Sequence, residues 1–435
     1  MRAWSQKSGS GNRRKLRAFG LMALCLLAVQ AAGQTPKDVR NTAKVGPRAV
    51  PQLAGYLDNP DVGVRVEAVK ALTDVGGTST LDPLIKATHD NDPEVQIRAT
   101  DGLVNFYVPG YVRTGLASRI SRVGTQIKSH FTDTNDQIVD SFIRVRPEII
   151  AALAQLVRGG ASMDSRAEAA RAVGILRGQA AVPDLLNALR SKDTGLMYES
   201  LVALQKIRDR DAGPGIQFVL RDLDERVQLT AIQTTGILLN RDAIPVLVRI
   251  FNDTRNAKVK RAALSALAMM PDGQSRPLFI EYLRDKDART RGAAAEGLGR
   301  LRNRADTGTI DAIYKDEDKT SPRLSQAFAL VMEGQSQLSE FSPLQYLINT
   351  LNSAAYAGDA FALLTEAARY AEVRALLYEP MEKGTRDEKI YLARVLAASG
   401  DEQSLPYLQK ISQDPDAQVA TEGLKALREL RARLS

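Results

Sequence analysis

Short apolar stretches alternate with polar turns along most of this chain, and they recur at a nearly constant interval. Four of these stretches each contain one proline, and the spacings between Pro183, Pro214, Pro245 and Pro277 are 31, 31 and 32 residues. A second stretch, rich in Ala and Leu, follows each of them. In both kinds of stretch small and apolar residues recur at i, i+3, i+4 and i+7, the spacing of an amphipathic helix. The pattern therefore predicts a solenoid built from pairs of helices.

The polar turns carry residues that begin helices. We expect the first helix of each pair (helix A) to begin near its proline, which is tolerated best in the first helical turn. We expect the second helix (helix B) to begin at an N-cap residue that is followed by proline. Such pairs occur at Asn59-Pro60, Asp92-Pro93 and Asp414-Pro415.

An Asp before helix B and a basic residue early in it mark several pairs, as at Val64-Arg65, Lys260-Arg261 and Thr290-Arg291. Together with the helix A prolines, these features resemble HEAT repeats, in particular the short units of phycobilisome-lyase-like HEAT proteins. The resemblance covers nearly all of residues 47–434. It implies an all-α fold, a right-handed α-solenoid of about eleven two-helix HEAT-like repeats.

The repeated Asp and Arg residues have two interpretations. They could form a ladder that binds a partner, or Asp could cap helix B while a neighbouring Arg bonds the adjacent turn. We favour the structural interpretation, because single exposed ion pairs contribute little stability and capping explains their repetition better.

The period also divides the chain into parts. Residues 105–146 interrupt it with glycines and β-branched residues, and we expect an irregular element there with a helix around 116–129. The expected parts are an N-terminal segment (1–33), a linker (34–46), repeats one and two (47–104), an irregular insertion or degenerate repeat (105–146), regular repeats (147–342), and divergent repeats with a C-terminal cap (343–435).

The first 33 residues have the composition of an export signal. A basic stretch (13–17) precedes an apolar run (19–29) and small residues (30–33), and the run is short for a membrane span. We therefore expect an exported protein, periplasmic or secreted. The alternative is an uncleaved segment that anchors the chain to the membrane. The single cysteine, Cys25, lies in this run, so the processed chain would need no disulfide.

The net charge of +8 comes mostly from this N-terminal segment. The segment holds six basic residues and no acidic one, and removing these six from the 59 basic residues leaves 53 against 51 acidic residues. A nucleic-acid-binding protein needs a basic stripe on its folded body. The nearly neutral body therefore disfavours a nucleic-acid partner.

Residues suited to catalysis are sparse. The histidines are His89 and His130, and no His-Glu pair occurs, so an iron site like that of the helical-repeat enzyme deoxyhypusine hydroxylase has no ligands. Neither a Gly-x-Ser-x-Gly elbow nor a phosphate-binding loop is present, and we expect Gly297 and Gly299 to permit close helix packing instead. We expect no catalysis, cofactor or metal. The alternative is a bilin-lyase-like or other HEAT-repeat enzyme.

The insertion concentrates aromatic residues in a chain that has few of them, and it adds several arginines. Both residue types are enriched at recognition hot spots, and irregular segments often carry specificity. The alternative is that these rings only fill the groove between repeats. We expect a scaffold that grips an unidentified protein partner with the inner surface lined by B helices and with this insertion. The candidate binding residues are Phe106, Tyr107, Tyr111, Arg113, Arg119, Arg122, Phe131 and Phe142.

Overall fold

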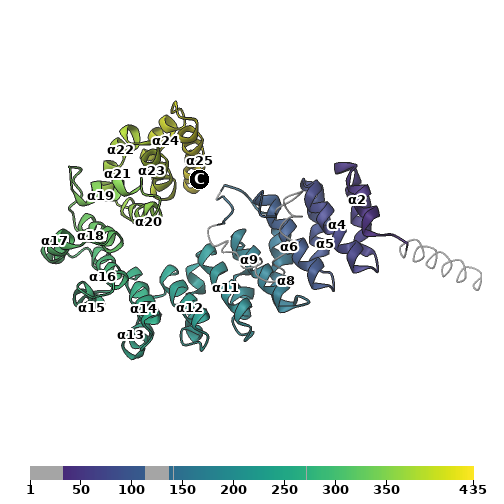
Figure 1. Ribbon diagram of the computed structural model, residues 1–435, viewed down its shortest axis with the longest axis horizontal. Helices are drawn as coiled ribbons and strands as arrows, with labels where there is room; N and C mark the ends of the chain where they lie inside the picture. The colour runs from purple at the N-terminus through teal and green to yellow at the C-terminus, as the bar shows by residue number, and fades with distance from the viewer. Residues whose placement is uncertain (1–32, 113–136, 141, 271) are drawn as a thin grey trace, which may run out of the picture. The chain divides into compact units, whose positions relative to one another are not determined.

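The computed structural model describes residues 33–112, 137–140, 142–270 and 272–435 (Figure 1). Helices are the only regular secondary structure in these ranges, which confirms the expected all-α class and the α-solenoid. The helices form two compact units. One unit combines the chain up to Gln137 with Val145–Leu176, and the other combines Ile138–Arg144 with Arg177–Ser435.

The first unit contains three helix pairs, preceded by α2 (Pro36–Ala43). Helix α2 lies in the range expected as a linker, and that expectation is wrong. Its Val39 is fully buried against the repeats, and Thr35 and Asp38 form a capping box at its start. The pairs are α3 (Val50–Gly55) with α4 (Val62–Val75), α5 (Leu81–Ala87) with α6 (Pro93–Tyr107), and α8 (Pro147–Gly159) with α9 (Met163–Ile175).

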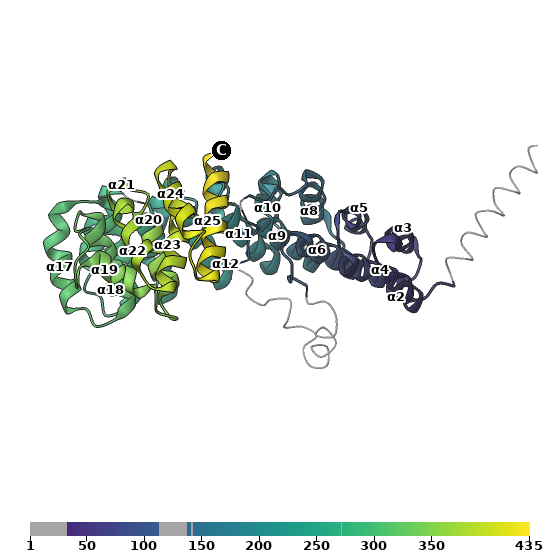
Figure 2. The ribbon, with the colours of Figure 1, turned by 90° about the horizontal axis from the view of Figure 1, so that it is seen from above.

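The second unit contains eight further pairs, so the described residues hold eleven, in agreement with the expected number. In Figure 2 its last B helices, α23 and α25, pack side by side. The A helices are α10 (Val182–Ala188), η7 (Arg210–Val219), α13 (Ile244–Asp253), α15 (Arg276–Tyr282), α17 (Thr307–Asp316), α19 (Pro343–Thr350), α21 (Ala371–Leu376) continued by α22 (Tyr378–Lys383), and α24 (Leu405–Ile411). The B helices are α11 (Thr194–Ile207), α12 (Glu225–Ile237), α14 (Ala257–Met269), α16 (Ala288–Leu301), α18 (Thr320–Met332), α20 (Ala357–Ala367), α23 (Arg386–Ser399) and α25 (Ala417–Leu434).

The core follows the repeat register. Leu204, Thr235, Leu267 and Leu298 occupy the same place in four successive B helices, and all four are fully buried. Proline falls in the first turn of most A helices, as expected. Three of the eleven differ: α17 and α21 contain no proline, and η7 is a 3-10 helix with Pro214 inside it. Pro214 removes a backbone donor, and the glycines on either side of it are weak helix formers, so an α-helix is disfavoured there.

Of the three Asx–Pro pairs predicted to begin B helices, one does so and two do not. Helix α6 does begin at Pro93 with Asp92 as its N-cap. Helices α4 and α25 instead begin two residues later than expected, because Asp61 and Asp416 are their caps. Asn59 and Asp414 accept hydrogen bonds from the backbone N–H groups of these capping residues, each at 2.9 Å. The turn is therefore an Asx-x-Asx motif, in which the first residue fixes the loop and the second caps the helix.

The end of helix α18 buries a carboxyl group, that of Glu333. Burial raises its pKa to about 7, with a further increase from Asp306, while the hydroxyl of Thr307 and the charge of Arg276 oppose the shift. One oxygen accepts the Thr307 hydroxyl at 2.7 Å, and the other has no hydrogen-bond partner. The folded protein therefore keeps this carboxyl protonated up to a higher pH than the unfolded chain does.

We expect Glu333→Gln to stabilise the protein more at pH 8 than at pH 5. The pKa of Glu333 is higher in the folded state than its usual 4.5. The wild type therefore loses stability as the pH rises from 4.5 through about 7. Glutamine keeps the shape without the charge. Melting temperatures of both proteins across this range measure the difference, and an equal difference at both pH values would contradict the expectation.

Candidate interaction site

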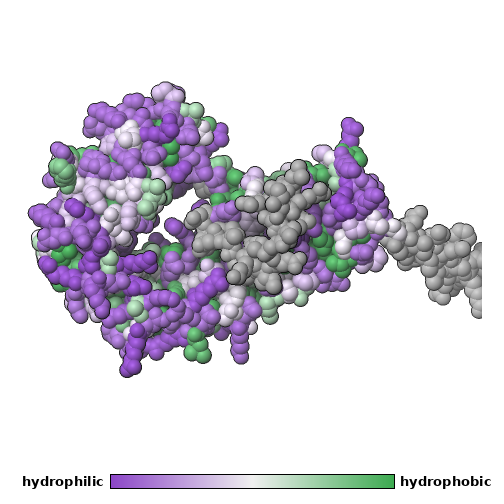
Figure 3. All heavy atoms as spheres, viewed as in Figure 1, coloured by the Kyte–Doolittle hydropathy of each residue, from purple (hydrophilic) through white to green (hydrophobic). Residues whose placement is uncertain are grey.

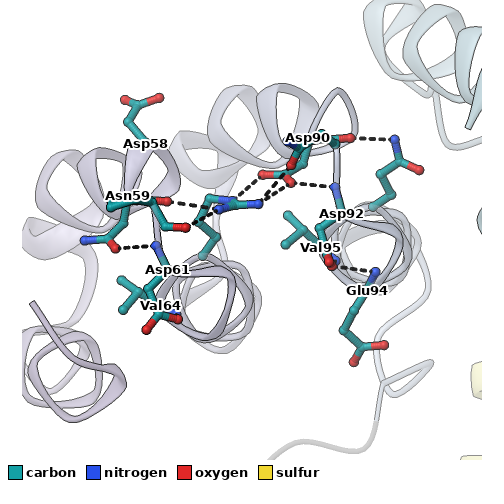
Figure 4. Close-up of polar contacts among 12 residues, drawn as sticks. Asp58, Asn59, Asp61, Val64, Asp90, Asp92, Glu94 and Val95 are labelled. Carbon is teal, nitrogen blue, oxygen red and sulfur yellow. Dashed lines mark hydrogen bonds and ion pairs between the residues drawn. The ribbon is translucent and has the colours of Figure 1, made fainter. Parts of the chain in front are cut away.

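The repeated Asp and Arg residues form a structural ladder, and Figure 4 shows its contacts between the turns at Asp61 and Asp92. Arg65 of α4 is almost buried, and its guanidinium bonds both carboxylate oxygens of Asp90 in the next turn at 2.7 and 2.9 Å. It also donates to the backbone oxygens of Asn59 and Pro60 in its own turn. One side chain therefore fastens two consecutive turns together.

The ladder recurs along the chain. Arg261 bonds Asp287 at 3.0 Å, Lys389 bonds Asp414 at 2.9 Å, and Arg291 makes a bidentate pair with Glu317 at 2.7 Å. In α6 the equivalent position is Gln96, whose side-chain amide donates to the Asp90 backbone oxygen at 2.7 Å, while Arg98 pairs with Glu94 of its own helix. The Asx residues before seven B helices accept backbone N–H groups: Asp61, Asp92, Asp193, Asp224, Asn256, Asp287 and Asp416. The structural interpretation of this pattern is confirmed.

The candidate aromatic residues of the first unit divide into two places. Phe106 and Tyr107 belong to helix α6 and not to an irregular insertion, because the helix continues to Tyr107. Their rings pack edge to face with centroids 4.9 Å apart. The Tyr107 hydroxyl accepts the backbone N–H of Arg146 at 3.1 Å, just before α8 begins. These two rings therefore help to hold the start of α8 against the end of α6.

Tyr111 follows α6 and reaches a different element. Its hydroxyl donates to Glu168 of the B helix α9 at 2.8 Å, and Glu168 also accepts from Arg171 at 2.9 Å. Burial raises the pKa of Tyr111, and the carboxylates of Glu168 and Asp101 raise it further. Burial and the neighbouring Glu168 likewise raise the pKa of Asp101.

The charged residues beside Tyr111 were not among the candidates from the sequence. Glu168 and Arg171 are both nearly buried, and they stand three residues apart in a helix otherwise rich in alanine. In the sequence, this oppositely charged pair on an alanine-rich helix was the feature that could have pointed to a buried polar contact. Nothing in the sequence connects that pair to Tyr111, which lies 57 positions away.

Phe142 belongs to a stretch that packs with the second unit, and the residue is 37% exposed. In the same stretch Val139 is buried, and Asp140 pairs with Lys425 of α25 at 2.9 Å. The remaining candidates, Arg113, Arg119, Arg122 and Phe131, lie outside the described residues, as does the helix expected around 116–129. Of the four candidates that the structure describes, it brings Phe106 and Tyr107 into contact with each other.

Groups that could support catalysis are scattered in the part of the chain that the structure describes. No three His, Cys, Asp or Glu residues converge there to hold a metal ion. His89 lies within 3.1 Å of both the Ile85 backbone oxygen and the Gln155 side chain, so its ring joins α5 to α8. His130 lies outside the described residues. Among the described helices, none is long and apolar enough to cross a membrane.

We expect Tyr111→Phe to destabilise the first unit by about 1.5 kcal/mol, the scale of a hydrogen bond to a charged acceptor. The change removes one donor from the nearly buried Glu168 and leaves the ring in place. Hydrogen exchange of residues 105–112 and of α9 measures the effect. Unchanged protection in both segments would show that the bond contributes nothing.

Family models for HEAT repeats match residues 26–104 and 244–330, and a model of the PBS lyase HEAT-like repeat matches residues 165–191. The structure of the complex of CpcE and CpcF of phycocyanin lyase from Nostoc is 18% identical, covers 68% of this chain and 92% of that chain, and has a TM-score of 0.32. Importin beta is 14% identical, covers 88% of this chain and 57% of that chain, and has a TM-score of 0.38. No curated protein is similar enough in sequence to count as a relative.

Proposed function

Since this chain is a HEAT-repeat protein, we propose that it is an exported scaffold that binds a protein partner and catalyses no reaction itself. The partner would contact the surface lined by B helices and the irregular stretch between α6 and α8. Stacked helix pairs present such extended surfaces by construction, and solenoids use them for binding.

The bond between Tyr111 and Glu168 carries this proposal. It ties Tyr111, which follows α6, to the B helix α9 at 2.8 Å, so the chain leaves α6 beside a B helix. Aromatic and charged side chains then lie together, as they do at the centre of protein interfaces. Among the aromatic candidates that the structure describes, Phe142 is the most exposed.

A photo-crosslinking residue in place of Phe142 tests the proposal. We expect it to capture a discrete partner in cells, which mass spectrometry would identify. The matched control replaces Phe341, which is 86% exposed in the loop between α18 and α19. The same adducts at both positions, or none at Phe142, would count against a partner site at this stretch.

A lyase-like activity is the second candidate, and it is supported by the match of one repeat, residues 165–191, to the PBS lyase HEAT-like model. Incubation of the purified protein with free bilin and a candidate acceptor protein, followed by denaturing electrophoresis, would test it. Colour that stays on the acceptor would favour the enzyme, while colour that migrates only as free bilin would favour the scaffold.

Export rests on the basic and apolar pattern of the first 33 residues. N-terminal sequencing of the native protein tests it. A new N-terminus near residue 34 supports export with cleavage, and an intact N-terminus in the membrane fraction supports the anchor.

A further inference from the structure

Four consecutive turns of the second unit carry an unusual number of exposed basic residues. These turns join helix A to helix B at residues 190–193, 221–226, 253–258 and 284–289, and we call them the basic edge. The first three hold two basic residues each and the fourth holds three, and all nine side chains are exposed.

The turns of the basic edge lie next to one another. Arg190 of the first stacks over Phe218 beside the second turn, with 4.7 Å between the guanidinium carbon and the ring centroid. Lys258 of the third pairs with Glu225 of the second at 2.7 Å. Arg221 approaches Asp253 at 3.9 Å. These contacts link three successive turns, and Arg261 of α14 reaches the fourth through Asp287.

Acidic residues in the same turns are engaged in other contacts. Glu225 and Asp253 are the exposed ones, and both are paired as described. The others are half-buried and accept backbone N–H groups at the helix starts: Asp193, Asp222, Asp224, Asp285 and Asp287. The outermost layer is therefore cationic. Lys192, Arg255 and Lys286, each in the middle of its turn, have no ion pair within the described residues.

The repeat fold does not require this charge. In other repeats the residue just before the helix B cap is Pro60, Asn91 or Pro415, and in the Glu317-x-Lys319 turn it is Asp318. None of these four residues is basic. In the basic edge the same position is Lys192, Leu223, Arg255 and Lys286, at intervals of 31, 32 and 31 residues. Among the described turns this position is basic in three, Lys192, Arg255 and Lys286, and all three belong to the basic edge, which indicates a local function.

Exposed apolar residues coincide with the basic edge. Leu223 is the most exposed large hydrophobic residue of the described chain, at 102% of its reference exposure, and Phe218 beside it is 50% exposed. Figure 3 shows a surface that is mostly hydrophilic, with scattered apolar residues. Leu223 stands at the tip of its turn, between Arg221 and Arg226. This arrangement suits a partner whose surface is charged outside and apolar below.

We propose that the basic edge docks the second unit on an anionic membrane surface, with the cations at lipid headgroups and Leu223 inserted below them. The tips of neighbouring turns can all contact one flat membrane surface. Each basic residue near an anionic leaflet strengthens the attraction between the protein and the membrane. A nucleic acid is less suitable, because Arg190 and Arg226 already occupy one face of the rings of Phe218 and Tyr198, where a base would stack.

An environment-sensitive dye at position 223 tests the proposal in the full chain. Cys25 is the single cysteine, so Cys25→Ser with Leu223→Cys gives one labelling site. We expect a blue shift with phosphatidylcholine vesicles that contain phosphatidylserine, and its loss at high salt. The matched control, Cys25→Ser with Arg210→Cys, labels an exposed residue where a B helix leads into the next A helix. Its dye should not shift.

Charge reversal provides the second arm. Lys192→Glu with Lys286→Glu should weaken the salt-sensitive shift about tenfold or more in vesicle titrations. The control pair Arg210→Glu with Arg241→Glu should leave it unchanged. Equal shifts with neutral vesicles, a shift at position 210, or no shift at 223 would each overturn the proposal. Retention on polyglutamate or DNA without vesicle binding would also overturn it and assign the edge to that partner. A partner captured at Phe142 is independent of all these outcomes.

Discussion

Replacing Arg65 by methionine is expected to lower the free energy of unfolding of the first unit by about 3 kcal/mol. The guanidinium makes bonds to Asp90, to Asn91 and to two backbone oxygens of its own turn, and its side chain is only 10% exposed. The bond to Asp90 is also the largest cause of the raised pKa of Arg65. Methionine keeps most of the aliphatic packing but leaves the Asp90 carboxylate, itself 10% exposed, without a counter-charge.

Hydrogen exchange and urea denaturation would measure this loss, and exchange should increase in both α4 and α6. The matched control is Arg40→Met, which removes a 52% exposed arginine paired with Glu67 at 3.3 Å. Exposed pairs of that kind contribute about 0–1 kcal/mol. Equal losses for the two variants would show that the ladder does not hold neighbouring repeats together.

The repeat architecture was readable from the sequence because it depends on local chemistry that recurs. The prolines of the A helices and the apolar positions of the B helices each repeat at nearly one interval, and every repetition supports the others. Leu204 and its equivalents could be placed in the core for this reason, and all are buried. The number of helix pairs followed from the same period.

The errors in the sequence analysis arose where several local choices compete. Proline after Asn59 or Asp414 suggested a cap at those residues, yet a second Asx two positions later makes the better cap and shifts the helix start. In the linker, the buried Val39 shows that packing on α4 stabilises a helix that composition did not indicate. Neither outcome can be decided from one turn considered alone.

The candidate site was only partly predictable, because its contacts join distant parts of the chain. Tyr111 could be selected as an aromatic residue in an irregular stretch, but its partner Glu168 is on another helix. The net charge of the body was equally uninformative, because it averages over turns of opposite sign. The basic edge becomes visible only when the fold aligns equivalent turns and shows which acids are engaged in capping.

Gly299→Ala is expected to destabilise the second unit by about 2 kcal/mol, although alanine is the better helix former. A Cβ at this position would lie 2.7 Å from the Ala329 Cα of α18, a backbone atom that cannot move alone, so α16 and α18 would have to separate. The matched control, Gly308→Ala in α17, has nothing within 4 Å of the added Cβ and should gain about 0.5 kcal/mol. Urea denaturation followed by circular dichroism measures both. Stabilisation by both substitutions would contradict the close approach of the two B helices, which is the contact on which stacking of the repeats depends.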